Sequence, residues 1–278
     1  MQEKFIRDFL MFIAMQEIKI RNATMRDKPR ILEFCKNTWQ GMETGLEDTQ
    51  HDYISFVYDS WIRKKSMITA EIDHRPVAIL NVNPCNDGSA WLEGMRVDPE
   101  YRRKGVASVL TSYVLEKYKK VRMSIFDWNE PSKKLAGKLG AKLIDTYIFI
   151  TLDDFKYKNE NCKFAKQPER IFALTDYGKK PVFVDWSYFY PDLETIKTLV
   201  KKRAIMEDTD GFGYVLRSKQ DVSLIIDNAV KIDRLLNSFC NRYKNRKKFL
   251  ILSSAIYDSN KHFVFTNTEK LNIYEISR

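Results

Sequence analysis

Cysteine, histidine, glycine and proline are all scarce in this chain of 278 residues, which has 4 Cys, 3 His, 10 Gly and 8 Pro. The cysteines stand far apart, with no CxxC pair and no histidine at metal-ligand spacing, so neither a disulfide framework nor a structural zinc site is expected. The few glycines and prolines exclude a collagen-like or low-complexity chain. No run of about 18 uncharged apolar residues occurs, so no membrane span is expected. These absences favour a soluble protein in a reducing, cytoplasmic setting.

Apolar residues are plentiful, because they make up 44% of the chain, and aromatic residues make up 13%. A chain of this length and composition can bury one large core or two ordinary ones. Intrinsic disorder is therefore excluded as the main state.

The charge is unevenly divided along the chain. The net charge is +10, and residues 155–278 hold 23 basic against 15 acidic residues, or +8, which leaves +2 for residues 1–154. Basic runs such as Lys201–Arg203 and Arg242–Lys248 are suited to nucleic acid or another anionic ligand. No aromatic-interleaved RNA motif accompanies them, so a solvated basic surface is the favoured interpretation. Nucleic acid is left as an alternative for this half.

Helical and extended patterns alternate along residues 17–151. Apolar residues three or four apart predict helices, and alternation or short apolar runs bounded by turn residues predict strands. The pattern predicts an α/β (α+β) unit with the order strand, helix, helix, three strands, helix, strand, helix, strand. The corresponding residues are 17–21, 27–37, 53–62, 67–72, 76–82, 90–97, 106–118, 121–126, 131–139 and 143–151.

Composition suggests four segments along the chain. Residues 1–14 carry an apolar helical stripe and are expected to be an N-terminal extension or a short helix, ahead of a domain over residues 15–152. Residues 153–169 are polar and aperiodic, as expected of a linker. A smaller α/β domain then covers residues 170–278. Its expected strands are 170–174, 181–186, 212–217, 249–253, 262–266 and 271–276, and its expected helices are 193–203 and 222–243.

The segment from Val97 to Ala107 joins a predicted strand to a predicted helix. Gly105 and Ala107 remove side-chain bulk where the helix begins, so consecutive backbone N–H groups can converge on a phosphate. The helix N-terminus adds partial positive charge, and the basic triplet 102–104 adds full charges. The segment therefore predicts an anion site, with an ordinary glycine-containing turn as the alternative.

The signature R-x-x-G-x-A is present here as Arg102, Gly105 and Ala107. With the strand before it and Asn129 after the next strand, the segment resembles the GNAT superfamily of N-acetyltransferases, over about residues 17–151. The resemblance implies the GNAT acyl-CoA N-acyltransferase fold, with a mixed, mostly antiparallel sheet. It also implies acetyl-CoA as cosubstrate, bound where the strand ending at Val97 parts from the next, and no metal. The positions that match the coenzyme A site of the family are Met95, Val97, Arg102, Arg103, Lys104, Gly105, Val106, Ala107 and Asn129.

A narrower resemblance rests on several short motifs taken in order. They are Thr38-Trp39, His51-Asp52-Tyr53, Trp61, Asp87-Gly88, Glu93 to Val97 and Lys104 to Ala107. In this order they resemble the histidine N-alpha-acetyltransferase branch, whose members carry a C-terminal extension similar to a partial second GNAT fold. The resemblance implies a free amino acid or another small amine as acceptor, and it accounts for residues 170–278.

The family resemblance implies direct attack of a neutral amine on the thioester in a ternary complex, with the oxyanion held by a backbone N–H near Val97. A base must first take a proton from the ammonium. Glu93 is the first candidate, because strand alternation places Glu93, Met95 and Val97 on one side if no bulge intervenes. The alternative, equally weighted, is a structural Glu93 that pairs with Arg96 or with a neighbouring strand.

Polar and aromatic residues near the motifs are candidates to bind or orient the acceptor. They are Trp39, His51, Asp52, Tyr53, Trp61 and Trp91. Trp39, Asp52 and Tyr53 are the favoured substrate-binding residues, since such sites are mostly apolar with a few polar groups. At least two of the aromatic residues are expected to be core.

The sequence departs from the family pattern at Ala136, where many members carry a tyrosine that protonates the leaving thiolate. Water, Tyr147 or Tyr53 is then expected to supply the proton. Two other functions stay open at this point. One is acetylation of a protein or peptide amine, and the other is a non-catalytic acyl-CoA-binding regulator. The oligomeric state is also open, with a homodimer among the alternatives.

Overall fold

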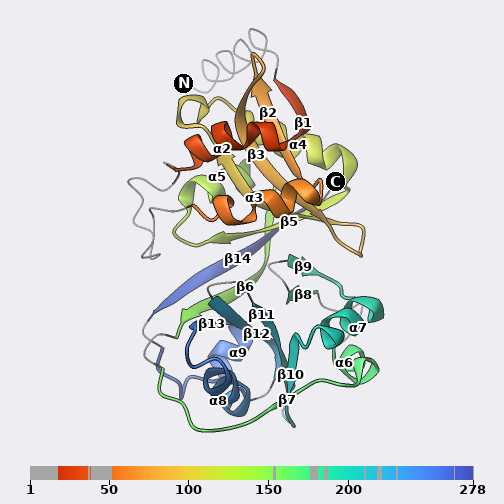
Figure 1. The fold of residues 1–278 in the computed structure, drawn as a ribbon, viewed down its shortest axis with the longest axis vertical. Helices are drawn as coiled ribbons and strands as arrows, with labels where there is room; N and C mark the ends of the chain where they lie inside the picture. Colours follow the sequence, from red (N-terminus) through yellow and green to blue (C-terminus); the bar gives the residue numbers. More distant parts are fainter. Residues whose placement is uncertain are drawn as a thin grey trace.

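The computed structural model describes residues 18–36, 38, 52–152, 155–175, 181–184, 187–209, 211–217, 221–229, 231–265 and 267–277. These residues form two halves stacked along the longest axis of the molecule, with strands passing from one half to the other (Figure 1). The predicted N-terminal segment 1–14 lies outside the described residues. None of the helices in the described ranges has the length and apolar character that crossing a membrane requires.

In the first half the elements follow the predicted order, and their ends differ from the predicted ends by at most two residues. The strands predicted at 67–72 and 90–97 have those bounds. The elements are β1 (Lys19–Asn22), the 3-10 helix η1 (Met25–Asp27), α2 (Lys28–Cys35), α3 (Ile54–Arg63), β2 (Met67–Ile72), β3 (Arg75–Pro84), β4 (Ala90–Val97), the 3-10 helix η2 (Pro99–Tyr101), α4 (Val106–Lys117), β5 (Lys120–Phe126), α5 (Glu130–Lys138) and β6 (Lys142–Thr151).

The second half is also α/β, but its elements match the sequence less well. They are β7 (Lys163–Phe164), α6 (Pro168–Leu174), β8 (Val182–Val184), β9 (Ser187–Phe189), α7 (Leu193–Lys201), β10 (Ile205–Glu207), β11 (Gly211–Arg217), β12 (Asp221–Ala229), α8 (Asp233–Arg242), β13 (Lys247–Ser253), α9 (Ser254–Ser259) and β14 (Thr268–Ser277).

Three predicted elements of this half are wrong. Residues 170–174 are helical rather than extended, in a short helix that begins at Pro168. The helix predicted over 222–243 is the strand β12 followed by α8. The apolar side chains of β12 are buried on both faces, and such a run has no period that distinguishes strand from helix. The described part of 262–266 forms no strand.

One large sheet of 12 strands runs through both halves of the described chain, in the order β1-β2-β3-β4-β5-β14-β6-β13-β12-β11-β10-β7. In this sheet β4–β5 and β12–β13 pair in parallel and the other neighbours pair antiparallel. The predicted mixed, mostly antiparallel sheet is therefore confirmed. The order is also symmetric about its middle. Counted inward from the two ends, β1, β2, β3, β4 and β5 correspond to β7, β10, β11, β12 and β13, and β14 corresponds to β6. The second half thus repeats the topology of the first.

The last strand of each half lies within the other half. In Figure 1, β14 runs between β5 and β6 at the middle of the molecule, and β6 in turn pairs with β13. Leu271 of β14 lies opposite Phe126 of β5 on one side and Tyr147 of β6 on the other. The two predicted domains therefore share backbone hydrogen bonds along their whole junction.

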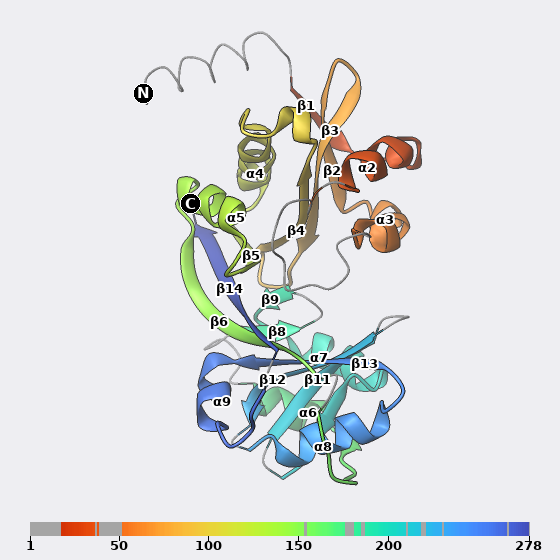
Figure 2. The ribbon, with the colours of Figure 1, turned by 90° about the vertical axis from the view of Figure 1, so that its left-hand side faces the viewer.

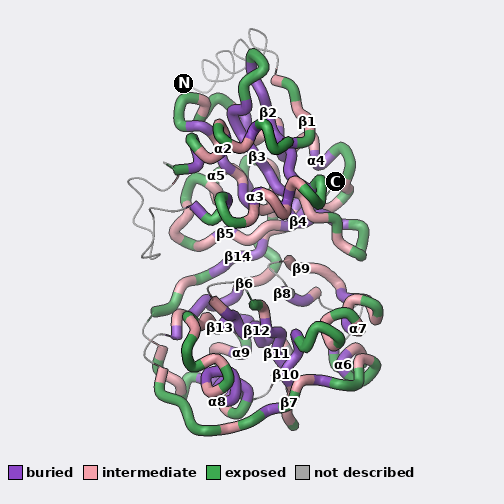
Figure 3. Tube along the Cα trace, in the orientation of Figure 1, coloured by how far each residue is buried: buried purple, intermediate pink, exposed green. Residues whose placement is uncertain are grey.

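In the first half, helices cover both faces of the sheet. Figure 2 shows α2 and α3 on one face and α4 and α5 on the other. The apolar stripe of α4, Val106, Leu110 and Val114, packs onto the sheet in one cluster, and Ile31 of α2 packs with Trp61 of α3 in another. The central strands are buried along most of their length (Figure 3). This sandwich holds β4 rigidly in its centre.

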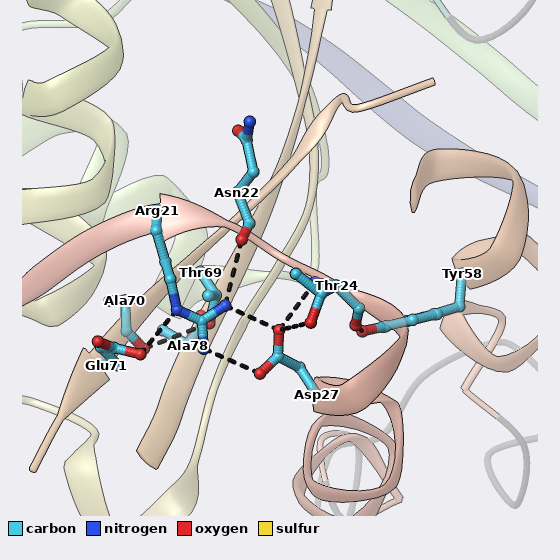
Figure 4. A network of polar contacts seen from close by, with 9 residues as sticks. All are labelled: Arg21, Asn22, Thr24, Asp27, Tyr58, Thr69, Ala70, Glu71 and Ala78. Atoms are coloured by element: carbon cyan, nitrogen blue, oxygen red, sulfur yellow. Dashed lines mark hydrogen bonds and ion pairs between the residues drawn. The ribbon is translucent and has the colours of Figure 1, made fainter. Parts of the chain in front are cut away.

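One arginine fixes the outer strand β1 to its neighbouring strand β2 and to the 3-10 helix η1 (Figure 4). Arg21 donates to both carboxylate oxygens of Asp27, at 2.8 and 2.9 Å, and its Nε donates to Glu71 of β2 at 2.8 Å. Asp27 also accepts the backbone N–H of Thr24, which starts the helical turn ahead of α2. Tyr58 of α3 donates to the Thr24 carbonyl at 2.7 Å. Strand, turn and both helices are thereby held together.

Candidate active site

The parallel strands β4 and β5 lie side by side only at their beginnings. Residues 90–92 pair with residues 121–123, and β4 then continues to Val97 without β5 beside it. On this side of β4, no other strand of the described chain takes the place of β5. Backbone groups on that edge of residues 93–97 are therefore open to a ligand, as an unpaired strand edge is. This is the parting of strands that the resemblance implies.

A tight turn joins the end of β4 to α4. Arg102 Nε donates to the Val97 carbonyl at 3.2 Å, so the turn is tied back to the strand. Gly105, the residue that caps α4, has a φ of 79°, and Arg103 has a φ of 61°. Glycine adopts this left-handed conformation at little cost, whereas an arginine in it is strained. Strain of this kind concentrates at functional sites.

The turn fits an anionic group such as the pyrophosphate of acetyl-CoA. The N–H groups of the first turn of α4, from Val106 to Ser108, have no acceptor inside the helix, and they lie at its positive end. The side chains of Arg102, Arg103 and Lys104 are exposed beside them. Helix N–H donors, the positive end of the helix and three basic residues thus lie within one short turn. The predicted coenzyme A residues of this turn are brought together.

A β-bulge overturns one expectation about β4. Glu93 and Arg96 lie opposite residues of β3 that are two apart, so β4 holds one extra residue between them. Glu93 and Arg96 therefore share a face, while Met95 and Val97 pack against the apolar cluster of α4 on the other. The prediction that Glu93, Met95 and Val97 lie on one side is wrong, because it depended on unbroken alternation.

Glycine makes the bulge possible at position 94. Gly94 has a φ of 67°, and a Cβ added there would lie 2.6 Å from the ring of Trp61. The Trp61 side chain, 6% exposed, packs in the core between α3 and the sheet. Trp61 is therefore a core residue, and so is Trp91 at 1% exposed. The bulge lies where β4 parts from β5.

Glu93 is held by two amides of the neighbouring strand. Its Oε1 accepts Asn81 Nδ2 at 2.8 Å and Asn83 Nδ2 at 2.6 Å. Asn81 is itself fully buried, and its Oδ1 accepts the hydroxyl of Ser66 at 2.6 Å. The carboxylate is thus oriented from one side by a preformed polar row. The sequence analysis did not foresee this row, although Asn81 and Asn83 stand out as amides at alternate positions of a strand.

Asp52 forms a buried ion pair with Arg96. The guanidinium donates to both carboxylate oxygens, at 2.5 and 3.0 Å, and the two side chains are 3% and 5% exposed. Asp52 also accepts the N–H of Ile54 at 3.1 Å, at the start of α3. The pair therefore joins α3 to the bulge of β4. Both of its carboxylate oxygens are engaged, which favours a positioning role over direct contact with an acceptor.

Tyr53 lies over this ion pair. Its ring is 5.2 Å from the Arg96 guanidinium and meets Trp61 edge to face at 6.1 Å between centroids. The residue is 41% exposed. Its ring is thus held by Arg96 and Trp61 on one side and is accessible to solvent on another, which is compatible with contact to a substrate. The other two residues named with it, Trp39 and His51, lie outside the described residues.

Asn129 lies in the connection from β5 to α5, where its Oδ1 accepts the N–H of Ser132 at 3.2 Å and caps α5. Its side-chain amide nitrogen is thereby directed away from the helix. Ala136, where a tyrosine is common in the family, is buried at 1% exposed. The position offers neither a hydroxyl nor access to solvent.

Tyr147 is not placed to protonate a thiolate near β4. It is fully buried on β6 and donates to Asp227 of β12 at 2.9 Å. Burial and the nearby carboxylates of Asp227 and Asp145 raise the pKa of Tyr147 well above its ordinary value. A second hydrogen bond joins the halves with the roles reversed: Tyr188 of β9, in the second half, donates to Asp145 of β6 at 2.7 Å. Both tyrosines join the two halves.

Arg122 of β5 is a further residue that the sequence analysis missed. It is 2% exposed and donates to Asp87 at 2.7 Å, to Glu275 of β14 at 2.8 Å and to the carbonyl of Tyr188 at 3.1 Å. It therefore fixes the β3–β4 turn and the β8–β9 hairpin to the parting strands. An arginine inside the apolar strand KVRMSIF is the signal that could have revealed it, since buried charges need partners.

The comparisons with known proteins agree with this geometry. Residues 31–141 match the family model described as Acetyltransferase (GNAT) family. A histidine N-acetyltransferase of Scomber australasicus is 22% identical over 231 residues, which cover 74% of this chain and 64% of that protein. The chain therefore matches less than two thirds of the length of this relative.

Two solved structures extend the likeness to the second half. A Thermoplasma acidophilum protein, provisionally named an acetyltransferase, has a TM-score of 0.72 at 22% identity, covering 94% of this chain and 100% of that one. A tandem GNAT protein from the clavulanic acid biosynthesis pathway has a TM-score of 0.56 at 10% identity, covering 94% and 98%. At these identities the likeness shows the fold. Residues 31–141, with the parted strands and the glycine turn at their centre, form an acetyltransferase domain of the GNAT family.

Proposed function

We propose that this protein transfers the acetyl group of acetyl-CoA to a primary amine of an amino acid or another small molecule. The observation that carries the proposal is the parting of β4 from β5 directly ahead of the left-handed turn at Gly105. Open backbone donors and an anion-binding helix end are thereby combined at one place. The match to the GNAT family model and the named histidine N-acetyltransferases support the reaction class.

The residues of the turn would hold the pyrophosphate through the amides of Val106 to Ser108 and through the basic triplet 102–104. When bound, acetyl-CoA supplies an acetyl group activated as a thioester. The open edge of β4 would donate an N–H near Val97 to the carbonyl oxygen, and one well-placed donor of this kind contributes about 3 kcal/mol. No covalent intermediate on the protein is needed. Burial raises the pKa of the Cys35 and Cys240 thiols to about 12, so these thiols stay neutral.

Glu93 is our candidate for the group that removes a proton from the incoming ammonium. Glu93 is the first residue of β4 beyond its pairing with β5, and the amides of Asn81 and Asn83 of β3 orient its carboxylate. Met95 and Val97 pack against α4 on the other face, so the acyl group would bind at the open edge of β4, beside the face that carries Glu93. A water that links Glu93 to the amine is compatible with this arrangement.

The second half supports a small acceptor. Asn86 of the β3–β4 turn donates to Thr195 at 2.6 Å and to Asp192 at 3.2 Å, so this turn is docked on α7. Trp91 of β4 packs edge to face on Phe183 at 6.0 Å. The sheet face next to Glu93 is therefore covered from the second half, which leaves less room for a peptide than for a single amino acid.

Titration of acetyl-CoA into the full chain, followed by an assay of thiol release with a panel of amines, tests the proposal. The variant Gly105→Glu places bulk and negative charge in the turn and should lose binding. Gly140→Glu is the matched control, since Gly140 has a φ of 75° and nothing lies within 4 Å of an added Cβ. Loss of binding in both variants would contradict the assignment of the acetyl-CoA site to the turn. Turnover that is faster on peptides than on amino acids would contradict the small acceptor.

A further inference from the structure

Three arginines of the second half gather around one aromatic ring, far from the parted strands. The guanidinium carbons of Arg203, Arg217 and Arg242 lie 5.4, 5.4 and 4.9 Å from the centre of the Phe164 ring. All three arginines are exposed, and Phe164 is partly buried. A shared aromatic ring for three cations is unusual, because a ring has only two faces to offer.

Four separate elements bring these side chains together. Phe164 belongs to the short edge strand β7, which pairs with β10 through two residues. Arg203 follows α7 with a φ of 52°, Arg217 ends β11, and Arg242 ends α8. The cluster therefore depends on the tertiary structure and is not a basic run of the sequence.

Neutral groups hold the guanidiniums in place. Arg217 donates from Nε to the Tyr243 hydroxyl at 2.9 Å and from Nη2 to the Arg203 carbonyl at 2.6 Å. Arg242 donates from Nη2 to the Cys162 carbonyl at 3.3 Å. These contacts fix the orientation of two cations without neutralising either.

Within the described residues, no carboxylate forms an ion pair with any of the three arginines. Two acidic residues of the same half have other partners, since Glu207 pairs with Arg170 at 3.1 Å and Glu160 with Arg234 at 3.7 Å. Within the part of the chain that the structure describes, each arginine of the cluster keeps N–H donors that have no protein acceptor. Three like charges thus share a region comparable to the Debye length, which is roughly 10 Å at 0.1 M salt.

We propose that Arg203, Arg217 and Arg242, arranged around Phe164, form a binding site for a phosphate-bearing anion. A phosphate group offers several acceptor oxygens to planar guanidinium forks, which is the geometry that arginine recognises best. The bound anion offsets the mutual repulsion of the three cations. This site is separate from the turn at Gly105 and stands whether or not the proposed acetyl transfer is correct.

The test is titration of pyrophosphate into the full chain at about 0.1 M salt, where weak surface attraction is largely screened. It is done in the wild type and in Gly105→Glu, so that binding at the turn is removed. We expect binding to persist in Gly105→Glu and to weaken by about tenfold in Arg217→Gln and in Arg242→Gln. Arg217→Lys keeps the charge but loses the planar fork, and it should weaken binding as well.

Arg234→Gln is the matched control, because Arg234 is a similarly exposed arginine of the same half that pairs with Glu160. It should leave pyrophosphate binding unchanged. Thermal unfolding of each variant shows that the fold is intact. Absence of binding in Gly105→Glu, or equal losses in Arg234→Gln and Arg217→Gln, would overturn the proposal. A short single-stranded RNA is titrated in parallel, and the tighter of the two ligands indicates whether the phosphate belongs to a small molecule or to a nucleic acid.

Discussion

The two halves share one topology but differ where their parallel strands meet. In the first half β4 and β5 pair over three residues on each strand and then part. In the second half β12 and β13 stay paired from Asp221 with Lys247 to Ile226 with Leu252, over six residues on each strand. The helix that follows also differs, since α4 begins at a left-handed glycine, whereas α8 begins after Ile232, with ordinary helical backbone.

This difference shows that a shared strand order is not sufficient to form a ligand site between the two parallel strands. A strand edge binds a ligand only where no neighbouring strand satisfies its backbone groups. In the second half the continuous pairing of β12 with β13 occupies those groups, and the side chains there fill an apolar core. The second half instead supplies Tyr188 and a complete strand, β14, to the first. It acts as a support for the site in the other half.

The largest effect is expected from breaking the buried ion pair that holds α3 against the parted strand. Asp52→Ala leaves the Arg96 guanidinium buried without its partner, and such a change costs about 3–5 kcal/mol of the free energy of unfolding. Because Tyr53 stacks on Arg96, the acceptor KM should rise as well. Urea unfolding and acetyl-transfer kinetics measure the two effects.

The double variant Asp52→Leu with Arg96→Met sharpens this test. Removing both charges should restore much of the stability, since an apolar pair avoids an unpaired buried charge. If the double variant unfolds as easily as Asp52→Ala, the ion pair is not the cause of the loss.

A smaller effect is expected from adding a methyl group at one glycine of each half that lies at a β-bulge. Gly94→Ala forces an alanine to a φ of 67° and pushes on the Trp61 ring, at a cost of about 1–2 kcal/mol for the backbone alone. It should also lower kcat/KM about a hundredfold, or roughly 3 kcal/mol, because the edge of β4 moves. Gly213→Ala, on β11 opposite the extra residue of β12, meets Leu224 at 2.8 Å and should cost stability only. Equal losses of activity in the two variants would refute the comparison.

The crossed tyrosine bonds between the halves come next in size. Tyr147→Phe and Tyr188→Phe each remove one hydrogen bond to a carboxylate, and each should cost about 1–2 kcal/mol. The pH profile of acetyl transfer should not change in Tyr147→Phe, because its hydroxyl faces Asp227 of the second half. A shifted alkaline limb in that variant would return Tyr147 to the list of proton donors.

The first half could be predicted from sequence almost completely. Its strands alternate or are bounded by turn residues, and its helices carry stripes at three- and four-residue spacing, so local pattern and tertiary burial agree. In β12 both faces are buried, and the pattern had no period to follow. The sequence also could not predict that β6 pairs with strands of the second half and β14 with β5 of the first, because backbone pairing between distant segments leaves no local signal.

The candidate site divides in the same way. The glycine turn is local, and its residues could be named from the signature alone. Glu93 was named, but its orientation depends on a bulge that requires Gly94 to meet Trp61, a contact between distant segments. The partners of Arg122 come from three separate parts of the chain, and only the rule that a buried charge needs counter-charges would have pointed to it.

The smallest effect concerns the outer strands, which are also unequal: β1 pairs through four residues and is fixed by Arg21, whereas β7 pairs through two. The hydrogen bonds from Arg21 lower the pKa of Asp27 below its ordinary 3.8. The unfolded chain therefore binds this proton first as the pH falls, so the stabilisation is complete above about pH 5 and is lost progressively below it. Since Arg21 is partly exposed, we expect about 1 kcal/mol. Urea unfolding of the wild type and Asp27→Asn should differ by this amount at pH 7, and the difference should shrink steadily as the pH falls from 5 towards 2; a difference that does not change with pH would assign the effect to packing rather than to charge.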